Sequence, residues 1–291
     1  MAYKNFIPTV WAAGIKRELE KMLVFAEDCN RKFEGKVTKF GDVVKITGVG
    51  KPTVRHLSRA NASADIEGPE EIEDTSVNMI INQLAYFNYM INDIDAAQAA
   101  GNIEDVLDKE STEVIADDID QYIANLAKDD SAVKLYNSPL TLVTGTASAG
   151  QKNVLDAIDD GLQKLRENNV KPNTKVVVTV SPRFLKLFEK EYRTIDTNNS
   201  NYLKNGFITR YNGVTVKLSS NVATATTSAA GDTDLIQIKT QRAIAYADPF
   251  TGIEPYRPQN KLFTDAVKGG TLYDAKIVRP KEMFIMNVKY A

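Results

Sequence analysis

The sequence has very little of the residues on which most active sites and metal centres depend. Its 291 residues include one cysteine, Cys29, and one histidine, His56. A single cysteine forms no internal disulfide. One cysteine and one histidine together cannot supply the four ligands of a structural zinc site. A serine or cysteine nucleophile would need His56 as its base, and His56 lies in a stretch with too few apolar residues to position it. We therefore expect no catalytic residue, no cofactor and no metal.

Long hydrophobic runs are missing as well. No stretch approaches the roughly 18 apolar residues that cross a bilayer, and the N-terminal "AYKNFIPTVW" lacks the apolar segment of a signal peptide. Apolar residues make up 43% of the chain and charged residues 25%, which is the balance of a soluble globular protein. We expect synthesis in a reducing cytoplasm and no membrane partner.

Charge is nearly balanced overall, with a net charge of -2, but it is divided unevenly along the chain. Residues 31–59 carry eight basic and two acidic residues, whereas residues 65–130 carry eighteen acidic residues and two lysines. The basic stretch includes "GKVTKFGDVVKITGVGKPTVRHL", whose alternation and glycine turns are typical of a β-ribbon. Its apolar side chains are too few to form a core, so we expect this basic ribbon to pack against something else.

Two long elements are predicted after the ribbon. Residues 77–93, "VNMIINQLAYFNYMIND", place apolar residues on one face and asparagines on the other, which predicts one long strand and an elongated molecule. Residues 103–130 predict a helix whose apolar face includes Val114 and Ile119. Its opposite face carries Asp105, Asp108, Glu113, Asp117, Asp118 and Asp120. A solvated acidic face is the ordinary interpretation, but it leaves the repulsion between these like charges unexplained.

Local signals in the second half predict a separate α/β unit. Residues 151–167 predict a helix, and residues 175–180 predict a strand that enters a second helix, with Ser181 as its N-cap and Pro182 as its first residue. The Asn212-Gly213 pair predicts a type I′ hairpin. Residues 235–246 and 276–289 return to strand patterns, and residues 11–26 near the N-terminus predict an amphipathic helix that seats on its own body or on a partner.

The order of these elements resembles a known family. The segments that carry the likeness are "FIPTVWAAGIKRELEKMLVFAEDCNRKFEGKV", "GDVVKITGVGKPTV", "VVVTVSPRFLKLF", "NGFITRYNGVTVKLSSNV" and "LYDAKIVRPKEMFIM". Together they resemble the major capsid proteins of tailed bacteriophages with the Hong Kong 97-type fold. The N-terminal segments look like the Salmonella podovirus coat-protein branch.

The resemblance implies an α+β fold of the Hong Kong 97 type. Its parts would be an N-terminal arm at 1–34, an extended β-loop at 35–76, a peripheral domain with the long helix and long strand at 77–143 and 256–291, and an axial α/β domain at 144–255. It also implies a structural protein, not an enzyme, that self-assembles as hexamers and pentamers into an icosahedral shell around double-stranded DNA.

Further expectations follow from the resemblance. The chain would be made in the cytoplasm of a bacterial host and end in the virion capsid. Its partners would be many copies of itself, a separate scaffolding protein, since no long segment precedes Phe6, a portal, and packaged DNA in weak non-specific contact. Within the same fold, a cellular nanocompartment that encloses protein cargo is an alternative, and a small α/β binding domain or enzyme with an assembly arm is another.

The resemblance and the charges together suggest what covers the basic ribbon. We infer that it packs on the acidic helix and long strand of a neighbouring copy, since a hairpin without its own core is marginal alone. The predicted interface joins Lys36, Lys39, Lys45, Lys51, Arg55 and Arg59 to Asp105, Asp108, Glu113, Asp117, Asp118 and Asp120 of that copy. Nucleic-acid binding by the ribbon is the alternative, and only Phe33 and Phe40 offer the interleaved aromatic rings that would favour it.

Overall fold

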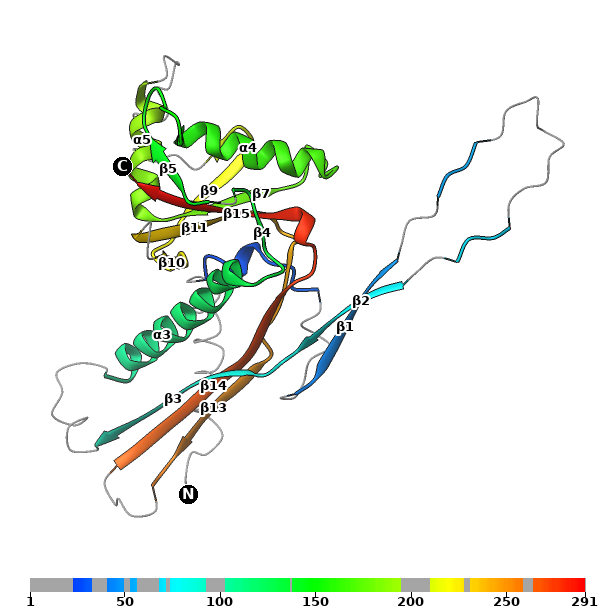
Figure 1. Ribbon diagram of the computed structural model, residues 1–291. Coiled ribbons are helices and arrows are strands. Elements are labelled where there is room, and N and C mark those ends of the chain that lie inside the picture. Colours follow the sequence, from blue (N-terminus) through cyan, green and yellow to red (C-terminus); the bar gives the residue numbers. More distant parts are fainter. Residues whose placement is uncertain are drawn as a thin grey trace.

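A computed structural model describes residues 23–32, 41–49, 53–56, 68–71, 74–92, 103–136, 138–194, 210–227, 231–258 and 264–290. Strands outnumber helices in this part of the chain. Figure 1 shows a rounded body that ends in the C-terminal strand, a group of long strands below it, and a two-stranded ribbon that projects to one side. The elongated shape expected from the strand pattern is present.

The body is built on a nine-stranded sheet. Its main order is β6 (Gln151–Asn153), β5 (Leu140–Val143), β15 (Met283–Tyr290), β11 (Gly231–Thr240), β7 (Val176–Val180), β9 (Val214–Leu218) and β8 (Arg210–Tyr211). Two further strands, β10 (Thr224–Thr227) and β4 (Val133–Lys134), pair with β11 and β15. Every residue of β7 is buried, as its unbroken apolar run requires for a strand covered on both faces.

The two helices predicted in this α/β unit are present. Helix α4 (Val154–Glu167) begins three residues later than predicted, because Gln151–Asn153 form β6, and its N-cap Asn153 accepts a hydrogen bond from the Leu155 amide at 2.9 Å. Helix α5 (Pro182–Thr194) starts with Ser181 as N-cap, because the Phe184 amide donates to its Oγ at 3.3 Å. Figure 1 shows both helices on the body.

The hairpin between β8 and β9 has the predicted turn. Asn212 has a φ of 45° and Gly213 a φ of 81°, and a type I′ turn requires positive values at both positions.

A second sheet holds the long strands. Its order is β12 (Ile244–Ala247), β14 (Thr264–Ile277) and β13 (Phe250–Tyr256), and β3 (Gln83–Asn92) pairs with residues 264–273 of β14 along the edge opposite β13. Helix α3 (Ile103–Asn125), followed by the 3-10 turn Leu126–Lys128, runs beside these strands in Figure 1. The Tyr122 hydroxyl of α3 donates to Asp274 of β14 at 3.0 Å, and the Tyr273 hydroxyl of β14 donates to Asp118 of α3 at 2.6 Å. Each element therefore donates one hydrogen bond to the other.

The predicted long strand is confirmed in its alternation but not in its continuity. Met79 and Ile81 are buried, while Ile80 and Asn82 between and after them are exposed. The strand divides at Ile81 and Asn82 into β2 (Asp74–Ile80) and β3, because β2 pairs with β1 (Val43–Val49) whereas β3 pairs with β14. Residues 74–76, at the end of the expected extended β-loop, are therefore part of β2.

Two segments with predicted strand patterns each run from one of these two sheets into the other. Residues 235–246 form β11 and β12 with a turn between them, and residues 276–289 form the end of β14 and then β15 with the 3-10 turn Pro280–Glu282 between them. Strand β15 lies in the nine-stranded sheet beside β11, whereas β14 pairs with β3 in the second sheet. One large core joins both sheets, and it includes Ile123, Ile238 and Tyr273.

The N-terminal helix predicted at residues 11–26 lies outside the described residues up to position 22. Its last residues do not continue a helix, since Val24 and Phe25 form a bend and turn that leads into the 3-10 helix Ala26–Asp28. This segment is nevertheless fixed to the body, with Leu23 and Phe25 buried in the large core.

Candidate assembly surface

The root of the ribbon packs on its own subunit. Strands β1 and β2 pair antiparallel, with Val43 opposite Ile80 and Ile46 opposite Val77. Val44 and Ile46 are buried together with Met79, Ile81, Ala245, Ala247 and Leu272. The expectation that the ribbon has no core of its own is therefore wrong at its root, where strands β12 and β14 supply the missing apolar surface.

The outer part of the ribbon has no such cover from the described residues. Residues 53–56 and 68–71 are exposed, and Val54 keeps 75% of its surface accessible. The two sides of the ribbon meet where the Thr53 amide and hydroxyl both donate to the Glu70 carboxylate at 2.9 Å. These bonds lower the pKa of Glu70. His56 is exposed in the same stretch.

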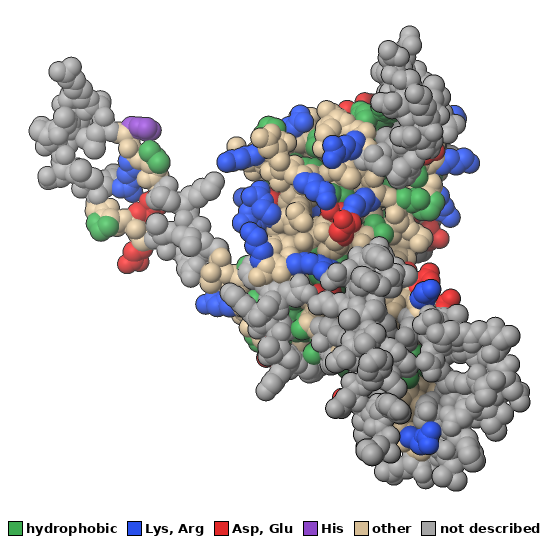
Figure 2. Space-filling view, turned by 180° about the vertical axis from the view of Figure 1, so that it is seen from behind, with side chains coloured by type: hydrophobic (Ala, Val, Ile, Leu, Met, Phe, Trp, Pro, Cys, Tyr) green, Lys and Arg blue, Asp and Glu red, His purple; other side chains and the backbone are tan. Residues whose placement is uncertain are grey.

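The structure locates two of the six predicted basic residues. Lys45 on β1 and Arg55 in the outer ribbon are both exposed. Lys36, Lys39, Lys51 and Arg59 lie outside the described residues. Figure 2 shows that Lys and Arg side chains also cover much of the body on the face seen there, so the positive charge of the molecule is not confined to the ribbon.

The acidic residues of α3 divide into groups. Glu113, Asp117 and Asp118 are exposed, as predicted. Asp117 accepts hydrogen bonds from Asn221 at 2.5 Å and from Gln121 at 2.7 Å, so part of its capacity is already used within the subunit. Asp105 and Asp108 lie on α3, and their side chains are outside the described part of the structure.

Asp120 was predicted on the exposed acidic face, and this prediction is wrong, because only 3% of its surface is exposed. Its carboxylate accepts hydrogen bonds from the amides of Val24 at 2.7 Å, Phe25 at 3.1 Å and Ala26 at 3.4 Å. Burial raises the pKa of Asp120, and these three amides oppose that rise. Asp120 therefore anchors the N-terminal segment of its own chain and is not offered to a neighbouring copy.

Val114 also lies on a different face of α3 from the predicted one. It is 68% exposed, although we expected it on the buried apolar face of the helix. The buried face of α3 keeps the predicted Ile119 and Ile123 and adds Ile115, Ala116 and Ala124. The helix thus turns Asp120 toward the core and Val114 away from it.

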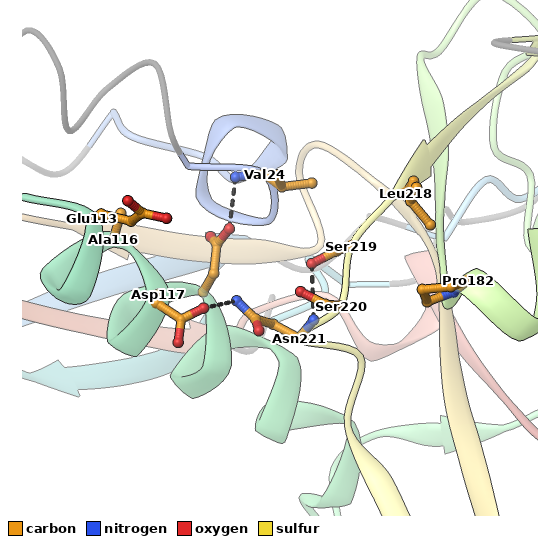
Figure 3. A pocket seen from close by; sticks show the side chains of 10 residues that line it. Val24, Glu113, Ala116, Asp117, Pro182, Leu218, Ser219, Ser220 and Asn221 are labelled. Carbon is orange, nitrogen blue, oxygen red and sulfur yellow. Dashed lines mark hydrogen bonds between the residues drawn. The ribbon is translucent and has the colours of Figure 1, made fainter. Parts of the chain in front are cut away.

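Two of the exposed acids line a cavity of about 510 Å³. Figure 3 shows Glu113 and Asp117 on α3 on one side, Ser219, Ser220 and Asn221 on another, and Val24 above them. A dashed line joins Asp117 to Asn221, and the Asn221 amide donates to the Ser219 hydroxyl at 3.2 Å. The cavity is anionic and open to solvent, so it suits a basic side chain.

A row of large apolar side chains lies on the exposed face of β1, β2 and β3. These residues, which we call the apolar stripe, are Val43, Ile80, Leu84, Tyr86 and Met90, each with half or more of its surface accessible. Beside the stripe lies a cavity of about 270 Å³ whose walls include Leu84 and Tyr86, and whose rim carries the Lys268–Glu254 ion pair at 2.8 Å. Because large exposed apolar patches mark interaction sites, these exposed residues make the stripe a candidate surface for assembly.

Metal and membrane sites have no support in the described ranges. In those ranges, no three His, Cys, Asp or Glu side chains are grouped so that they could hold a metal ion. Of the helices described, none is long and apolar enough to cross a membrane.

Comparison with known proteins gives a consistent answer at the level of structure. No protein-family model and no curated protein matches the sequence. A solved structure from Mycobacterium phage Che8 is 26% identical, with a TM-score of 0.68 over 98% of each chain. The capsid structure of Cyanophage P-SCSP1u is 14% identical, with a TM-score of 0.69 over 92% of this chain and 88% of that one. A virus-like particle from Pyrococcus furiosus is 8% identical, with a TM-score of 0.55 over 97% of this chain and 99% of that one.

The chain has the fold of bacteriophage capsid proteins. This agrees with the resemblance read from the sequence at the level of the fold. The Salmonella podovirus branch is a finer assignment, and none of the solved structures named above carries it.

Within this capsid fold, the apolar stripe is the feature that the sequence interpretation missed. Its signal was present, because Ile80, Leu84, Tyr86 and Met90 alternate with the residues that form the buried face. The asparagines among them gave the impression of a polar face. A count of large apolar residues on both faces of the strand would have found the stripe.

Proposed function

We propose that this chain is the major capsid protein of a tailed bacteriophage, and that it self-assembles into an icosahedral shell around double-stranded DNA. The observation that carries the proposal is the likeness to a phage structure over 98% of both chains, at 26% identity. The projecting ribbon supports it, because a long β-ribbon whose outer part is exposed gains stability mainly from a neighbouring molecule.

The proposed contact places the exposed side of the basic ribbon of one copy, from β1 to its outer part, across the acidic helix and long strand of the next. Lys45 and Arg55 are the described basic residues of this contact, and Lys36, Lys39, Lys51 and Arg59 complete it from the sequence. On the neighbour, Glu113, Asp117 and Asp118 remain candidates, with Asp105 and Asp108 on the same helix, while the buried Asp120 is withdrawn.

The apolar stripe adds a second component to this contact. Exposed ion pairs contribute only about 0.2–1 kcal/mol each, so charge alone would set register and encounter rate more than affinity. Burial of apolar surface contributes about 25 cal/mol for each Å², and the stripe offers such surface along the long strand. Many weak contacts repeated around every subunit add up to a stable shell, while each one remains weak enough to correct errors.

The remaining assignments belong to the same proposal. The subunits would form hexamers and pentamers with the help of a separate scaffolding protein and a portal, inside a bacterial host, and end in the virion. The chain would divide into an arm, an extended loop, a peripheral domain around β3, β13, β14 and α3, and an axial domain around the nine-stranded sheet, to which we now assign β15.

Electron microscopy of the purified chain tests this proposal. We expect closed particles when the chain is expressed with a scaffolding protein, and fewer particles as salt rises, because exposed charges are screened over about 8 Å at physiological ionic strength. Particles filled with protein cargo and no DNA would favour the nanocompartment instead. A chain that stays monomeric under all conditions would contradict the proposal.

A further inference from the structure

A pocket at the edge of the body gathers four cationic side chains from three distant parts of the chain. It has a volume of about 650 Å³ and lies between residues 27–32, residues 241–242 and Arg279. The cations are Arg31, Lys32, Arg242 and Arg279, and the one carboxylate that lines the pocket is Glu27. Pockets that bind small molecules span about 300–1,000 Å³, so the size is sufficient for a ligand.

Backbone hydrogen bonds fix the walls of this pocket. The Asn30 amide donates to the Ile244 carbonyl at 2.8 Å, and the Tyr246 amide donates to the Asn30 carbonyl at 3.1 Å. The Arg279 amide donates to the Ala243 carbonyl at 3.1 Å, which ties the third wall to the turn beside Arg242. The cationic side chains are therefore carried on rigid backbone, as a binding site requires.

Among the described residues, the carboxylates beside Arg31, Arg242 and Arg279 are fewer than these three cations. Arg242 and Arg279 share one carboxylate, that of Glu282, at 3.3 Å and 3.0 Å. The nearest oxygen of Asp248 lies 3.7 Å from the guanidinium of Arg31, and the buried Nε of Arg31 has no hydrogen-bond partner among the residues that the structure describes.

Other contacts of the lining residues leave the balance positive. Arg31 stacks over the ring of Tyr246 at 5.3 Å, which orients its guanidinium. Glu27 pairs with Lys217 at 2.5 Å. Among the described residues, the four cations of the lining outnumber the three carboxylates of Glu27, Asp248 and Glu282.

We propose that this pocket binds a phosphate group. Guanidinium groups each present five N–H donors in a planar fork that matches phosphate oxygens. A carboxylate offers two oxygens, whereas a phosphate offers up to four around one centre, so phosphate suits three guanidinium groups and an ammonium better. The amide side chains of Asn30 and Gln241 add neutral polar groups to the same lining. The phosphate belongs either to a nucleic-acid backbone or to a small phosphorylated compound.

Binding to the purified full-length chain tests the proposal without reference to shell assembly. Inorganic phosphate is titrated by calorimetry, and a short DNA duplex by fluorescence anisotropy, at matched ionic strength. The pocket variant carries Arg242→Gln and Arg279→Gln. The control carries Lys171→Gln and Lys281→Gln, which remove the same charge from exposed positions outside the pocket lining. Lys32→Gln is a second pocket variant that leaves the Glu282 ion pairs intact.

We expect the pocket variants to bind phosphate about tenfold more weakly, and the control to bind as the original chain does. If DNA binding weakens in the same variants and its salt slope falls by about one for each lost contact, the ligand is a nucleic-acid backbone. If DNA binding is unchanged while phosphate binding weakens, the ligand is a small phosphorylated compound.

Three results would overturn the proposal. The first is that inorganic phosphate does not bind, and the second is that pocket and control variants lose affinity equally. The third is that a peptide of residues 103–125 binds the pocket more tightly than phosphate. That result would make the pocket a binding site for the acidic helix of a second copy.

Discussion

The nine-stranded body and the β1–β2 ribbon show two different ways of stabilising a strand. In the body, β7 is buried along its whole length between neighbouring strands and helices. In the ribbon, only the root has cover, from the small cluster around Ile46, and the outer residues 53–56 are exposed. The body has a core of its own, whereas the described residues of the outer ribbon have no cover from the rest of the described subunit, which is why we propose that a neighbouring copy supplies it.

The largest effect on stability is expected in the body. Phe184 on α5 is fully buried in the large core, so Phe184→Ala should lower the free energy of unfolding by about 3–5 kcal/mol. Val54→Ala in the outer ribbon is the matched case, and it should change this free energy by less than about 0.5 kcal/mol. Denaturant unfolding of the unassembled chain measures both. Equal losses would remove the distinction between the two regions.

The next effect concerns the segment that Asp120 fixes to the body. Asp120→Ala leaves the amides of Val24 and Phe25 without their acceptor and should cost up to about 3 kcal/mol. Glu113→Ala, on the exposed side of the same helix, should be nearly neutral. Urea denaturation of the two variants compares them, and a neutral Asp120→Ala would mean that these bonds are replaced by water at no cost.

A smaller effect is expected at the ribbon root. Ile46→Ala removes a buried side chain from a small cluster and should cost about 2 kcal/mol, at the low end for such changes because the cluster has few members. Hydrogen exchange of the β1 amides reports the loss locally. If exchange in β1 is unchanged, the root is not held by this cluster.

The smallest effect appears only in acid. Burial acts to raise the pKa of Asp28, but the ammonium groups of Lys175 and Lys217 outweigh it and hold this pKa below its ordinary value. The resulting stability is fully present above the unfolded pKa of about 3.9 and is lost as the pH falls further. The stability difference between the original chain and Asp28→Asn should therefore be constant from neutral pH to about pH 5 and shrink below about pH 4. A difference that persists unchanged in stronger acid would contradict the assignment.

The same two regions explain what the sequence could predict. The caps at Asn153 and Ser181 and the Asn212-Gly213 turn depend on neighbouring residues, and the turn and the Ser181 cap were predicted at the correct positions. The division of the long strand at Ile81 depends on which distant strand lies alongside, and no local pattern contains that information.

The candidate sites show the same limit. The bonds of Asp120 reach residues about a third of the chain away, so its burial could not be read from the helix alone. The phosphate pocket unites Arg31, Arg242 and Arg279, which only the fold brings together. The basic residues of the ribbon could be proposed as an interface from the sequence because they are neighbours in it.

Particle assembly after charge reversal in the ribbon tests the central claim most directly. The variant carries Lys39→Glu, Lys45→Glu and Lys51→Glu, and the control reverses Lys164, Lys171 and Lys281 on the body. Circular dichroism checks that both fold, and electron microscopy counts closed particles. We predict a folded ribbon variant that forms few or no particles beside a control that assembles. Normal particles from the ribbon variant would contradict the claim that a neighbouring copy covers the ribbon through its charges.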